Sequence, residues 1–416
     1  MKQYPKYKDS GVSWIGEIPK RWNTRRLKFS CNLIQEKTTD SSLPYIALEN
    51  IESYSGKLLS TNTSIPEGSC NLYSTNDVLF SKLRPYLTKC VVAPSEGKCS
   101  SELLVLRDFE GENKYLQYLM LSPKYIEYID SSTYGAKMPR ANWLFIGNTS
   151  IPLPPLSEQH AIVSYLDKKT AQIDRFISEA TKEIEKLNEL KQTQIAHLVT
   201  HGTNPDAPMK DSGIVWIGQI PEHWKKARYK DVLSIQDEKV GKRKDLTLLS
   251  LTKQGVIIRD LAEMKGKFPK DFESYKVVHP DNIILCLFDV DETPRTVGLS
   301  HNEGMITGAY DVFSIKNIDK EYFLYHYLSL DDRKAMKPLY KGLRKTIPLP
   351  RLMGEHIFIP PASEQKAIVS AINSLNNKIE TLVSELTTQI DHLKELKQRI
   401  ISDAVTGKID VREVNN

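Results

Sequence analysis

The chain contains the same two sequence motifs twice, in the same order. Residues Lys8–Trp22 (KDSGVSWIGEIPKRW) and Lys210–Trp224 (KDSGIVWIGQIPEHW) are identical at ten of fifteen positions, at an offset of 202 residues. Residues Ile151–Leu166 (IPLPPLSEQHAIVSYL) and Ile357–Ile372 (IFIPPASEQKAIVSAI) are identical at ten of sixteen positions, at an offset of 206 residues. The segments between the motifs have diverged. A tandem duplication therefore predicts one shared frame that carries two different inserts.

Size and composition favour a globular protein. With 416 residues and 40% hydrophobic residues, the chain is large enough for two to four domains with apolar cores. No apolar run is long enough for a secretory signal or a membrane span, so we expect a cytoplasmic location. The cysteines are odd in number and lack C-x-x-C spacing, which favours reduced packing residues over metal ligands or disulfides. They are Cys31, Cys70, Cys90, Cys99 and Cys286.

Positive charge is concentrated outside two long segments of helical pattern. Ser157–Thr200 has seven acidic and six basic residues, and Ser363–Thr406 has six acidic and five basic residues, so each segment has a net charge of −1. Because the net charge of the whole chain is +5, the rest of the chain carries +7. Lys20–Lys28 has five cations and no anion, Lys225–Lys244 has eight cations against three anions, and Lys337–Lys345 has four against none. Clusters of Lys and Arg among Trp and Tyr are typical of nucleic-acid contact, although a single charge run is usually a solvated surface.

Heptad spacing predicts two long helices that begin near Ser157 and Ser363. Each serine follows a Pro-Pro pair and precedes Glu-Gln, which indicates a helix start with the serine hydroxyl as the N-cap. Apolar residues then recur at coiled-coil spacing. The predicted packing residues are Leu166, Ile173, Ile177, Ile184 and Leu187 in the first helix, and Ile372, Ile379, Leu386, Leu393 and Ile400 in the second.

The two helices are expected to pack against each other as an antiparallel pair. Neither apolar stripe is stable in water, and the short linker 201–209 favours an antiparallel arrangement with the inserts at opposite ends, related by a pseudo-two-fold axis. Burial of each stripe against its own insert remains an alternative. The expected boundaries are a first domain at 1–150, a helix and linker at 151–209, a second domain at 210–356 and a final helix at 357–416.

Each insert is expected to be an α/β (α+β) domain. The first offers strands at 44–48, 77–80, 90–93 and 103–106 with a helix at 114–121. The second offers strands at 246–251, 283–288 and 310–315 with a helix near 322–330. Loops after these strands carry polar and cationic side chains that suit phosphates and the major groove, although an exposed structural role is as common for any one of them. The DNA-binding candidates are Ser81, Lys82, Arg84, Tyr86, Lys98, Tyr134, Lys137, Arg140, Lys242, Arg243, Lys244, Lys253, Arg295, Tyr340, Lys341, Arg344 and Lys345.

No catalytic motif is recognisable, so we expect a chain that makes and breaks no covalent bonds itself. The sequence lacks a Walker glycine loop, an NPPY or DPPY methyltransferase motif and zinc-like histidine spacing. Asp281, Asp289 and Asp291 only faintly resemble a nuclease carboxylate set, because the lysine expected after the second acid is absent. We expect no catalytic residue, metal or cofactor in this chain.

The duplicated motifs resemble the specificity (S) subunit of type I restriction–modification systems over essentially the whole chain. The resemblance rests on KDSGVSWIGEIPKRW and KDSGIVWIGQIPEHW, and on PPLSEQ and PPASEQ at the starts of the two long helices. It implies that each insert is a target-recognition domain for one half of a bipartite DNA site and that the helices set the gap. No individual base contact carries over, because base-reading residues vary among members.

The resemblance also implies partners. Two modification subunits would supply adenine methylation from S-adenosylmethionine, and restriction (motor) subunits would supply ATP- and magnesium-dependent translocation and cleavage. Double-stranded DNA would be the ligand of this chain. Two alternatives remain: a coiled-coil adaptor without DNA specificity, which would show no salt-dependent DNA binding, and an autonomous nuclease or methyltransferase, against which the missing motifs argue.

Overall fold

The computed structural model describes residues 2–60, 68–243, 245–259 and 272–412. The chain forms two compact units: Met1–Thr181 with Thr387–Asn416, and Lys182–Leu386. Each unit combines an α/β domain with one segment of each of two long helices, α4 (Leu156–His201) and α8 (Ala362–Val405). We call the α/β parts domain 1 (residues 2–155) and domain 2 (residues 209–361).

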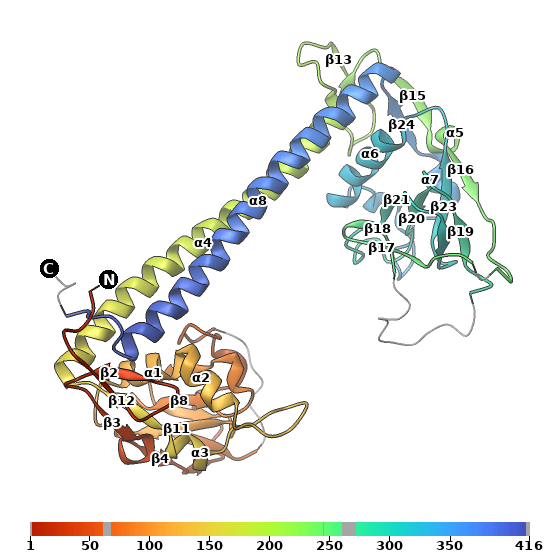
Figure 1. Ribbon diagram of the computed structural model, residues 1–416. Helices are drawn as coiled ribbons and strands as arrows, with labels where there is room; N and C mark the ends of the chain where they lie inside the picture. Colours follow the sequence, from red (N-terminus) through yellow and green to blue (C-terminus); the bar gives the residue numbers. More distant parts are fainter. Residues whose placement is uncertain (1, 61–67, 244, 260–271, 413–416) are drawn as a thin grey trace. The chain divides into compact units, whose positions relative to one another are not determined.

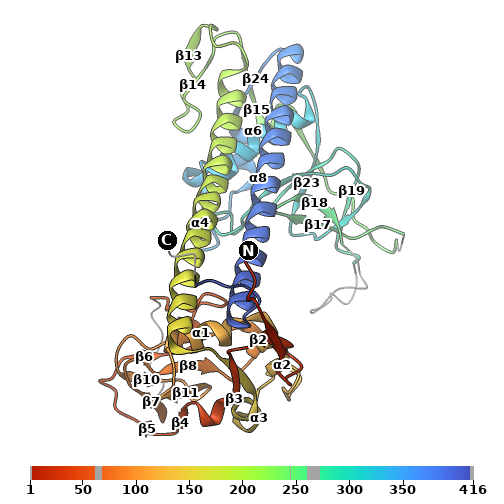
Figure 2. The ribbon, with the colours of Figure 1, turned by 60° about the vertical axis from the view of Figure 1, so that its left-hand side comes forward.

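Domain 1 is built around a central antiparallel sheet of order β4-β11-β8-β9 (Figure 2). A second sheet, β5-β7-β10-β6, covers one face, and helices cover the other. The strands are β4 (Asn32–Ile34), β5 (Lys37–Thr38), β6 (Tyr45–Ile46), β7 (Cys70–Tyr73), β8 (Val78–Ser81), β9 (Cys90–Val92), β10 (Gly97–Cys99) and β11 (Leu103–Arg107), and the helices are α1 (Asn113–Leu121), α2 (Pro123–Asp130) and α3 (Trp143–Asn148).

The alternation of side chains along β8 explains these layers. Val78 and Phe80 belong to the core shared with α1 and α2, whereas Leu79 points to the opposite core between the sheets, with Tyr73 and Val105. Side chains alternate between the faces of a strand, so a strand that is apolar at every position must be covered on both faces. The continuous apolar runs in the sequence are therefore the central strands of the domain.

Domain 2 repeats the plan with a sheet of order β16-β23-β20-β21, flanked by α6 (Figure 1). Phe313 and Ile283 face the core under the helices, and Val312 and Ile284 face the short sheets β17-β18 and β19-β22. The elements are α5 (Tyr229–Val232), β16 (Leu233–Gln236), β17 (Leu249–Thr252), β18 (Gly255–Ile258), β19 (Lys276–Val278), β20 (Ile283–Leu285), β21 (Val297–Leu299), β22 (Gly304–Ile306), β23 (Asp311–Ile315), α6 (Lys320–Asp332) and α7 (Leu349–Gly354).

Short antiparallel pairs formed by the duplicated motifs complete each domain. Strand β12, just before α4, pairs with β3, and β24, just before α8, pairs with β15. The repeated motif thus closes each domain beside the start of its helix. The pairs are β1 (Tyr7–Asp9) with β2 (Glu17–Pro19), β3 (Asn23–Arg26) with β12 (Ser150–Leu153), β13 (Met209–Asp211) with β14 (Gln219–Pro221), and β15 (Lys225–Arg228) with β24 (His356–Ile359).

Every strand region and helix expected from the sequence is present, but some bounds differ. The strand expected at 44–48 is only Tyr45–Ile46, followed by a short 3-10 helix at Leu48–Asn50. The Asn50 side chain accepts a hydrogen bond from the Ala47 backbone N–H at 2.7 Å, which favours a turn over continued strand. The strand expected at 246–251 is displaced to Leu249–Thr252, where it pairs with β18 in a hairpin.

Both long helices begin one residue before the predicted serine caps. Ser157 and Ser363 therefore lie inside the first turn and are exposed, so their prediction as N-caps was wrong. The prolines at 155 and 361 supply the first acceptors instead, since their carbonyls accept hydrogen bonds from the N–H groups of the following Glu and Gln residues.

The Glu-Gln pair of each repeat anchors its domain to the start of a helix. In unit 1, Gln159 Nε2 donates to the Pro154 carbonyl at 2.9 Å, and Gln159 Oε1 accepts from the Glu112 N–H at 2.8 Å. Glu158 accepts a hydrogen bond from the buried Trp22 indole at 2.8 Å. The Ser-Glu-Gln segment therefore connects the domain to the start of its helix.

Unit 2 repeats these contacts at the shifted positions. Gln365 Nε2 donates to the Pro360 carbonyl at 2.8 Å, and its Oε1 accepts from the Asp319 N–H at 2.6 Å. Glu364 accepts from the Trp224 indole at 3.2 Å. The repeated sequence motifs thus fold into repeated contacts.

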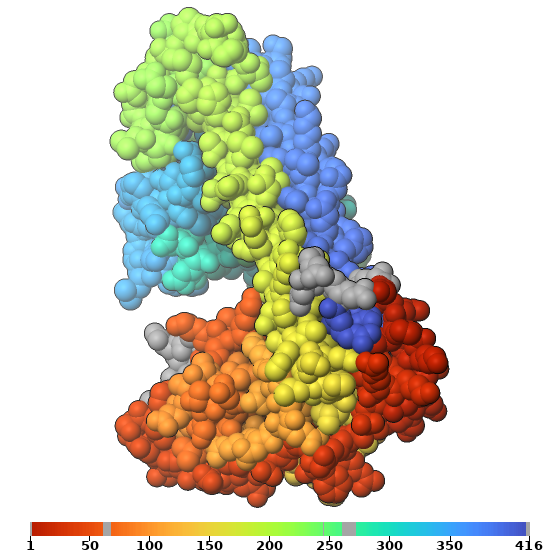
Figure 3. Space-filling view, turned by 90° about the vertical axis from the view of Figure 1, so that its left-hand side faces the viewer, coloured from red at the N-terminus to blue at the C-terminus, as the bar shows by residue number. Residues whose placement is uncertain are grey.

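In each unit the segments of α4 and α8 lie side by side and run antiparallel (Figure 3). In unit 1, Asp174 on early α4 pairs with Lys397 on late α8 at 2.6 Å, and Ile173 is buried. In unit 2, Lys191 on late α4 pairs with Glu380 on early α8 at 3.0 Å. The predicted antiparallel pairing of the two helices is confirmed.

The predicted heptad stripe faces the interior to different degrees. Leu166, Ile173, Ile372, Ile379 and Ile400 are buried, and Ile177, Ile184, Leu187, Leu386 and Leu393 are half-buried.

Candidate nucleic-acid interface

The structure brings two of the predicted loops of domain 1 together. The loop after β8 (residues 82–88) lies against the loop between α2 and α3 (residues 134–140), where the Arg84 N–H donates to the Pro139 carbonyl at 2.7 Å. Arg84 has a positive φ of 48°. A left-handed conformation is unfavourable for arginine, so the surrounding hydrogen bonds must hold it. We call these two segments the domain 1 loop pair.

Domain 2 has the same arrangement at the corresponding place. The loop after β20 (residues 286–296) lies against residues 340–346, and the Asp289 N–H donates to the Arg344 carbonyl at 2.8 Å. The φ of Asp289 is 47°, nearly that of Arg84 in domain 1. We call these segments the domain 2 loop pair. Divergent sequences therefore present two loops at equivalent positions in the two domains.

The arginines of the domain 1 loop pair are held by internal contacts. Arg140 Nε lies 3.1 Å from each carboxylate oxygen of Glu102, and its Nη2 lies 3.0 Å from Oε1. Arg140 Nη1 also donates to the Met138 carbonyl at 3.3 Å. Arg84 Nη2 donates to the Lys137 carbonyl at 3.1 Å. These guanidinium groups therefore stabilise the loops themselves.

The remaining candidates of this loop pair are available to a ligand. Tyr134 and Tyr86 are 62% and 42% exposed. The ammonium groups of Lys82 and Lys137 have no ion-pair partner within the described parts of the chain. Two aromatic rings beside two unpaired cations suit a ligand with phosphates and bases.

At or beside the domain 2 loop pair, three cations are paired with aspartates. Arg344 pairs with Asp289 at 2.6 Å, and Asp291 pairs with Lys345 at 2.7 Å and with Lys337 at 3.4 Å. The hydrogen bond from Lys345 lowers the pKa of Asp291, against a smaller effect of burial, and Lys337 lowers it further. Both aspartates therefore orient cations.

Seven candidates lie outside the two loop pairs or only support them. Lys98 is 1% exposed, and its ammonium donates a hydrogen bond to the Asp40 carbonyl at 2.6 Å. Its prediction as a DNA contact was therefore wrong, because the ammonium is buried and hydrogen-bonded inside domain 1. Ser81 is 2% exposed and its hydroxyl donates to the Leu83 carbonyl at 2.8 Å, which is again a structural role.

The other five of these candidates belong to domain 2. Lys242 and Lys253 are exposed in turns, and neither ammonium has an ion-pair partner in the described ranges. Arg243 lies among three carboxylates, the nearest being that of Glu238 at 3.3 Å, and Arg295 lies 3.8 Å from Asp332. Lys244 lies outside the described residues.

Tyr340 and Lys341 belong to the domain 2 loop pair. Tyr340 is half-buried against the core, and burial raises the pKa of its phenol to about 12. Lys341 is exposed, and its backbone pairs with Thr346 to close the hairpin. Leu343, at the tip, is 102% exposed. Sequence reasoning missed this residue, because a leucine gives no signal of a polar site.

Sequence reasoning also missed the residues that orient Arg344. Its guanidinium lies 5.0 Å from the centre of the Phe288 ring and donates a hydrogen bond to the Asp289 carboxylate. More than fifty residues separate these two residues from Arg344 in the sequence, so no local pattern could have revealed the contact.

Neither a metal site nor a membrane span is found where the structure describes the chain. No group of His, Cys, Asp or Glu side chains there could hold a metal ion, and no helix there is long and apolar enough to cross a bilayer. The five cysteines are buried and unpaired, and burial raises the pKa of Cys31 and Cys99 to about 12. These thiols are packing groups.

Comparison with known proteins gives consistent results. The profile of the type I restriction modification DNA specificity domain matches residues 16–186 and 221–392. The MjaVIII specificity subunit of Methanocaldococcus jannaschii is 28% identical over 77% of this chain and 76% of that protein. The putative MjaX specificity subunit of the same organism is 26% identical over 99% of both.

Solved structures share the fold. A chain from a structure of type I restriction–modification complex assembly has a TM-score of 0.71 and 18% identity, over 94% of this chain and 99% of that one. The specificity subunit from Thermoanaerobacter tengcongensis has a TM-score of 0.53 and 20% identity, over 94% and 98%. The profile matches both halves of the duplication, and it covers most of the chain. The chain therefore belongs to the family of type I restriction–modification DNA specificity subunits, which are the non-catalytic component of those systems.

Proposed function

We propose that domain 1 and domain 2 each read one half of a bipartite duplex DNA target, and that α4 and α8 fix the gap between the halves. The observation that carries the proposal is the matched pair of loops in the two domains, held by equivalent hydrogen bonds but carrying different side chains. Equivalent positions suit equivalent contacts with DNA, and different side chains suit different sequences. Half-sites on one face of the duplex would lie about 34 Å apart, one helical turn.

Phosphate contacts would supply affinity and register. Lys82 and Lys137 in domain 1, and Lys341, Lys242 and Lys253 in domain 2, are exposed or half-exposed cations without ion-pair partners in the described parts. Each phosphate contact releases counterions, so binding should weaken steeply as salt concentration rises. A coiled-coil adaptor without DNA specificity would show no such dependence.

Arg344 has the geometry of a guanine reader. Its Nε and Nη2 lie 3.4 Å and 2.6 Å from the two carboxylate oxygens of Asp289, and the side chain is still 68% exposed. This contact uses one side of the guanidinium. The opposite edge, formed by Nη1 and the second Nη2 proton, can donate two parallel hydrogen bonds to O6 and N7 of guanine.

The loop arginine of domain 1 is a natural contrast. Arg140 uses Nε and Nη2 for Glu102 and Nη1 for the Met138 carbonyl, so all three nitrogens of its guanidinium already donate within domain 1. The side chain of Arg344 is also fixed by the Phe288 ring at 5.0 Å. We therefore assign base reading to Arg344 and a supporting role to Arg140.

Modification and restriction subunits are the proposed partners, with the chemistry on their side. S-adenosylmethionine, ATP and magnesium would be bound by those subunits, and the assembly would work in the cytoplasm, where the DNA target is found. An apolar groove of about 650 Å³ in unit 1, lined by α4, α8 and residues 409–411, supports the docking of a partner. Phe176 at this groove is 58% exposed on a long helix.

Methylome sequencing of cells with and without the gene tests the proposal. Adenine methylation at a bipartite site should disappear with the gene and return with the wild-type chain. The Arg344→Ala chain should restore methylation, but with weaker preference for G·C at one position of the site. The free-energy difference between G·C and the other base pairs at that position should fall by about 1–3 kcal/mol. Lys316→Gln, which removes an exposed charge elsewhere on domain 2, is the matched control.

The outcome separates base reading from phosphate binding. Replacing that guanine by 7-deazaguanine removes N7, and should weaken binding of the wild type but not of Arg344→Ala. If Arg344→Ala weakens all sequences equally, the side chain contacts phosphate and the assignment as a base reader is wrong. If no bipartite methylation depends on the gene, the proposed function itself fails.

A further inference from the structure

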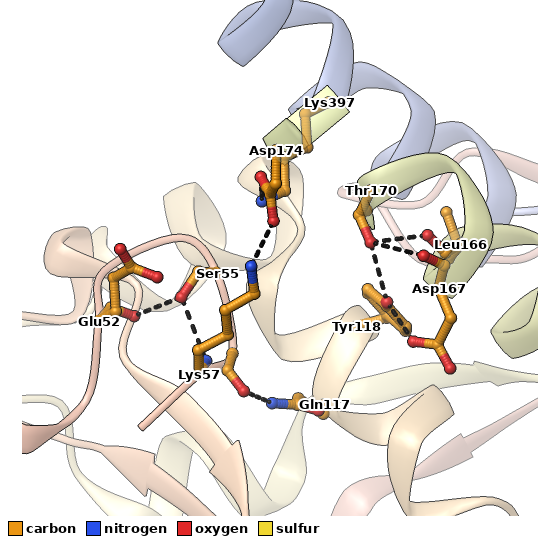
Figure 4. A network of polar contacts seen from close by, with 11 residues as sticks. Glu52, Ser55, Lys57, Gln117, Tyr118, Leu166, Asp167, Thr170, Asp174 and Lys397 are labelled. Atoms are coloured by element: carbon orange, nitrogen blue, oxygen red, sulfur yellow. Dashed lines mark hydrogen bonds and ion pairs between the residues drawn. The ribbon is translucent and has the colours of Figure 1, made fainter. Parts of the chain in front are cut away.

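Domain 1 contacts the helix pair of its own unit through a polar network (Figure 4). From α1, the Tyr118 hydroxyl donates to Asp167 Oδ1 on α4 at 2.6 Å and lies 3.3 Å from the Thr170 hydroxyl. The side chain of Tyr118 is buried. This contact fixes one point of the domain on α4.

A second point is an ion-pair bridge that joins three elements. Asp174 on α4 accepts a hydrogen bond from Lys57 of domain 1 at 2.7 Å through Oδ2, and from Lys397 of α8 at 2.6 Å through Oδ1. Burial raises the pKa of Asp174, but the two ammonium groups together outweigh this effect and lower it. We call this contact the Lys57–Asp174–Lys397 bridge.

The loop that carries Lys57 is itself held in place. Gln117 on α1 donates from Nε2 to the Gly56 carbonyl at 2.8 Å, and the Lys57 N–H donates to the Ser55 hydroxyl at 3.1 Å. Gly56 has a φ of 71°, and a Cβ there would lie 2.4 Å from Gln117 Nε2. The loop therefore presents Lys57 to the helix in one conformation.

Unit 2 has the first contact but a different second one. Tyr325 donates to Asn373 at 2.6 Å and accepts from Asn376 at 3.3 Å, at positions that match Tyr118, Asp167 and Thr170 in the repeat. Glu380 corresponds to Asp174 and pairs with Lys191 of α4. Within the described residues, no cation of domain 2 joins Glu380. The bridge from domain to helix is thus a feature of unit 1.

We propose that the Lys57–Asp174–Lys397 bridge fixes the orientation of domain 1 on the helix pair and thereby sharpens selection for the length of the DNA gap. This inference rests on the proposed function. A domain that is free to tilt on the helices can reach a half-site one base pair too near or too far. A domain held at both Tyr118 and Lys57 must first break a contact to do so.

The cost of releasing the domain limits the penalty for a wrong gap. Binding to a duplex whose gap differs by one base pair requires a strained duplex or a tilted domain, whichever costs less. The Lys57 side chain is 57% exposed and that of Asp174 is 23% exposed, so this ion pair is only partly shielded from water. Removing it should reduce discrimination against the wrong gap by about fivefold, the upper range for such a pair.

The test measures DNA affinity of the assembled methyltransferase for duplexes that contain both half-sites with the natural gap, one base pair fewer and one base pair more. Lys57→Gln removes the domain side of the bridge and leaves the Asp174–Lys397 pair, so the helices stay joined. Lys57→Arg keeps the charge and should keep the wild-type discrimination. Lys168→Gln removes an exposed charge on the same helix and is the matched control.

Lys57→Gln should bind the natural gap as the wild type does and bind both altered gaps about fivefold more tightly than the wild type does. Unchanged discrimination, or an equal loss of affinity for all three duplexes, would overturn the proposal, since the bridge would then be irrelevant or merely structural. If the wild type shows no preference among gaps, the bipartite function fails, and the inference fails with it. Methylated sites in cells carrying Lys57→Gln should keep both half-site sequences.

Discussion

Replacing Gln365 by alanine should destabilise unit 2 strongly, although the residue makes no proposed contact with DNA. Its side chain is 4% exposed and satisfies two backbone groups, the Pro360 carbonyl and the Asp319 N–H. Asp319 is also the N-cap of α6, where its carboxylate accepts from the N–H groups of Glu321 and Tyr322. The substitution therefore affects the start of two helices at once.

The magnitude follows from the two groups left without partners. A buried donor or acceptor that loses its only partner costs about 1–3 kcal/mol, so the two together should cost about 2–6 kcal/mol. Loss of the packed side-chain methylenes adds to this value. Gln159→Ala should have the same effect on unit 1, since its hydrogen bonds to Pro154 and Glu112 are equivalent.

Hydrogen exchange monitored by mass spectrometry is the appropriate assay, because two units need not unfold together. Gln365→Ala should accelerate exchange at the start of α6 and through domain 2 while leaving domain 1 unchanged. Lys366→Ala, at the exposed neighbouring position, is the control. A loss below about 0.5 kcal/mol, or equal acceleration in both domains, would refute the view that this amide joins domain 2 to its helix.

Three further predictions concern the spacer, the core of domain 2 and the partner surface. Deleting one heptad from each helix, 182–188 and 383–389, shortens the helix pair by about 10 Å. The gap between the methylated half-sites should then shorten by roughly three base pairs while the half-site sequences stay unchanged, as measured by methylome sequencing. Altered half-site bases would contradict the spacer role. Burial in domain 2, with a smaller effect of Arg333, lowers the pKa of His326 to about 4 from 6.5. The unfolded chain then binds a proton that the folded chain does not, and unit 2 should lose about 3 kcal/mol between pH 6.5 and 4 in denaturant titrations, a loss that His326→Gln should abolish. Phe176→Ser should weaken co-purification of the modification subunit while leaving the thermal unfolding midpoint within a few degrees, and undiminished co-purification would exclude this groove as the docking site.

The periodic parts of the fold could be predicted from the sequence because their signal is local. Apolar residues at sevens identified α4 and α8, and continuous apolar runs identified β8, β11 and β20. The predicted helix start was two residues late, since a serine after two prolines satisfies the cap pattern equally well inside the first turn. The strand at 44–48 was cut short by the Asn50 side chain, whose hydrogen bond to Ala47 has no signature in periodicity.

The sequence indicated which loops form the candidate site but not the role of each side chain in them. Charge and placement predicted DNA contacts in 81–86, 134–140 and 340–345. The structure places the first two of these loops together and the third against residues 286–296. The residue types alone could not distinguish the role of Arg140 from that of Arg344. The guanidinium of Arg140 donates hydrogen bonds to Glu102 and Met138, whereas that of Arg344 pairs with Asp289 and keeps a free edge. The residue types also could not show that Lys98 is buried.

The sequence by itself determined the duplication, the two helices, the two α/β domains and membership of a DNA specificity family, because repeated motifs and heptad periodicity are properties of neighbouring residues. Only the tertiary structure decided which side chains meet. Asp289 and Phe288 orient Arg344, and Asp174 joins Lys57 to Lys397, although these residues are far apart in the chain. Such contacts depend on the direction of each side chain within the packed fold, and sequence separation carries no information about that direction.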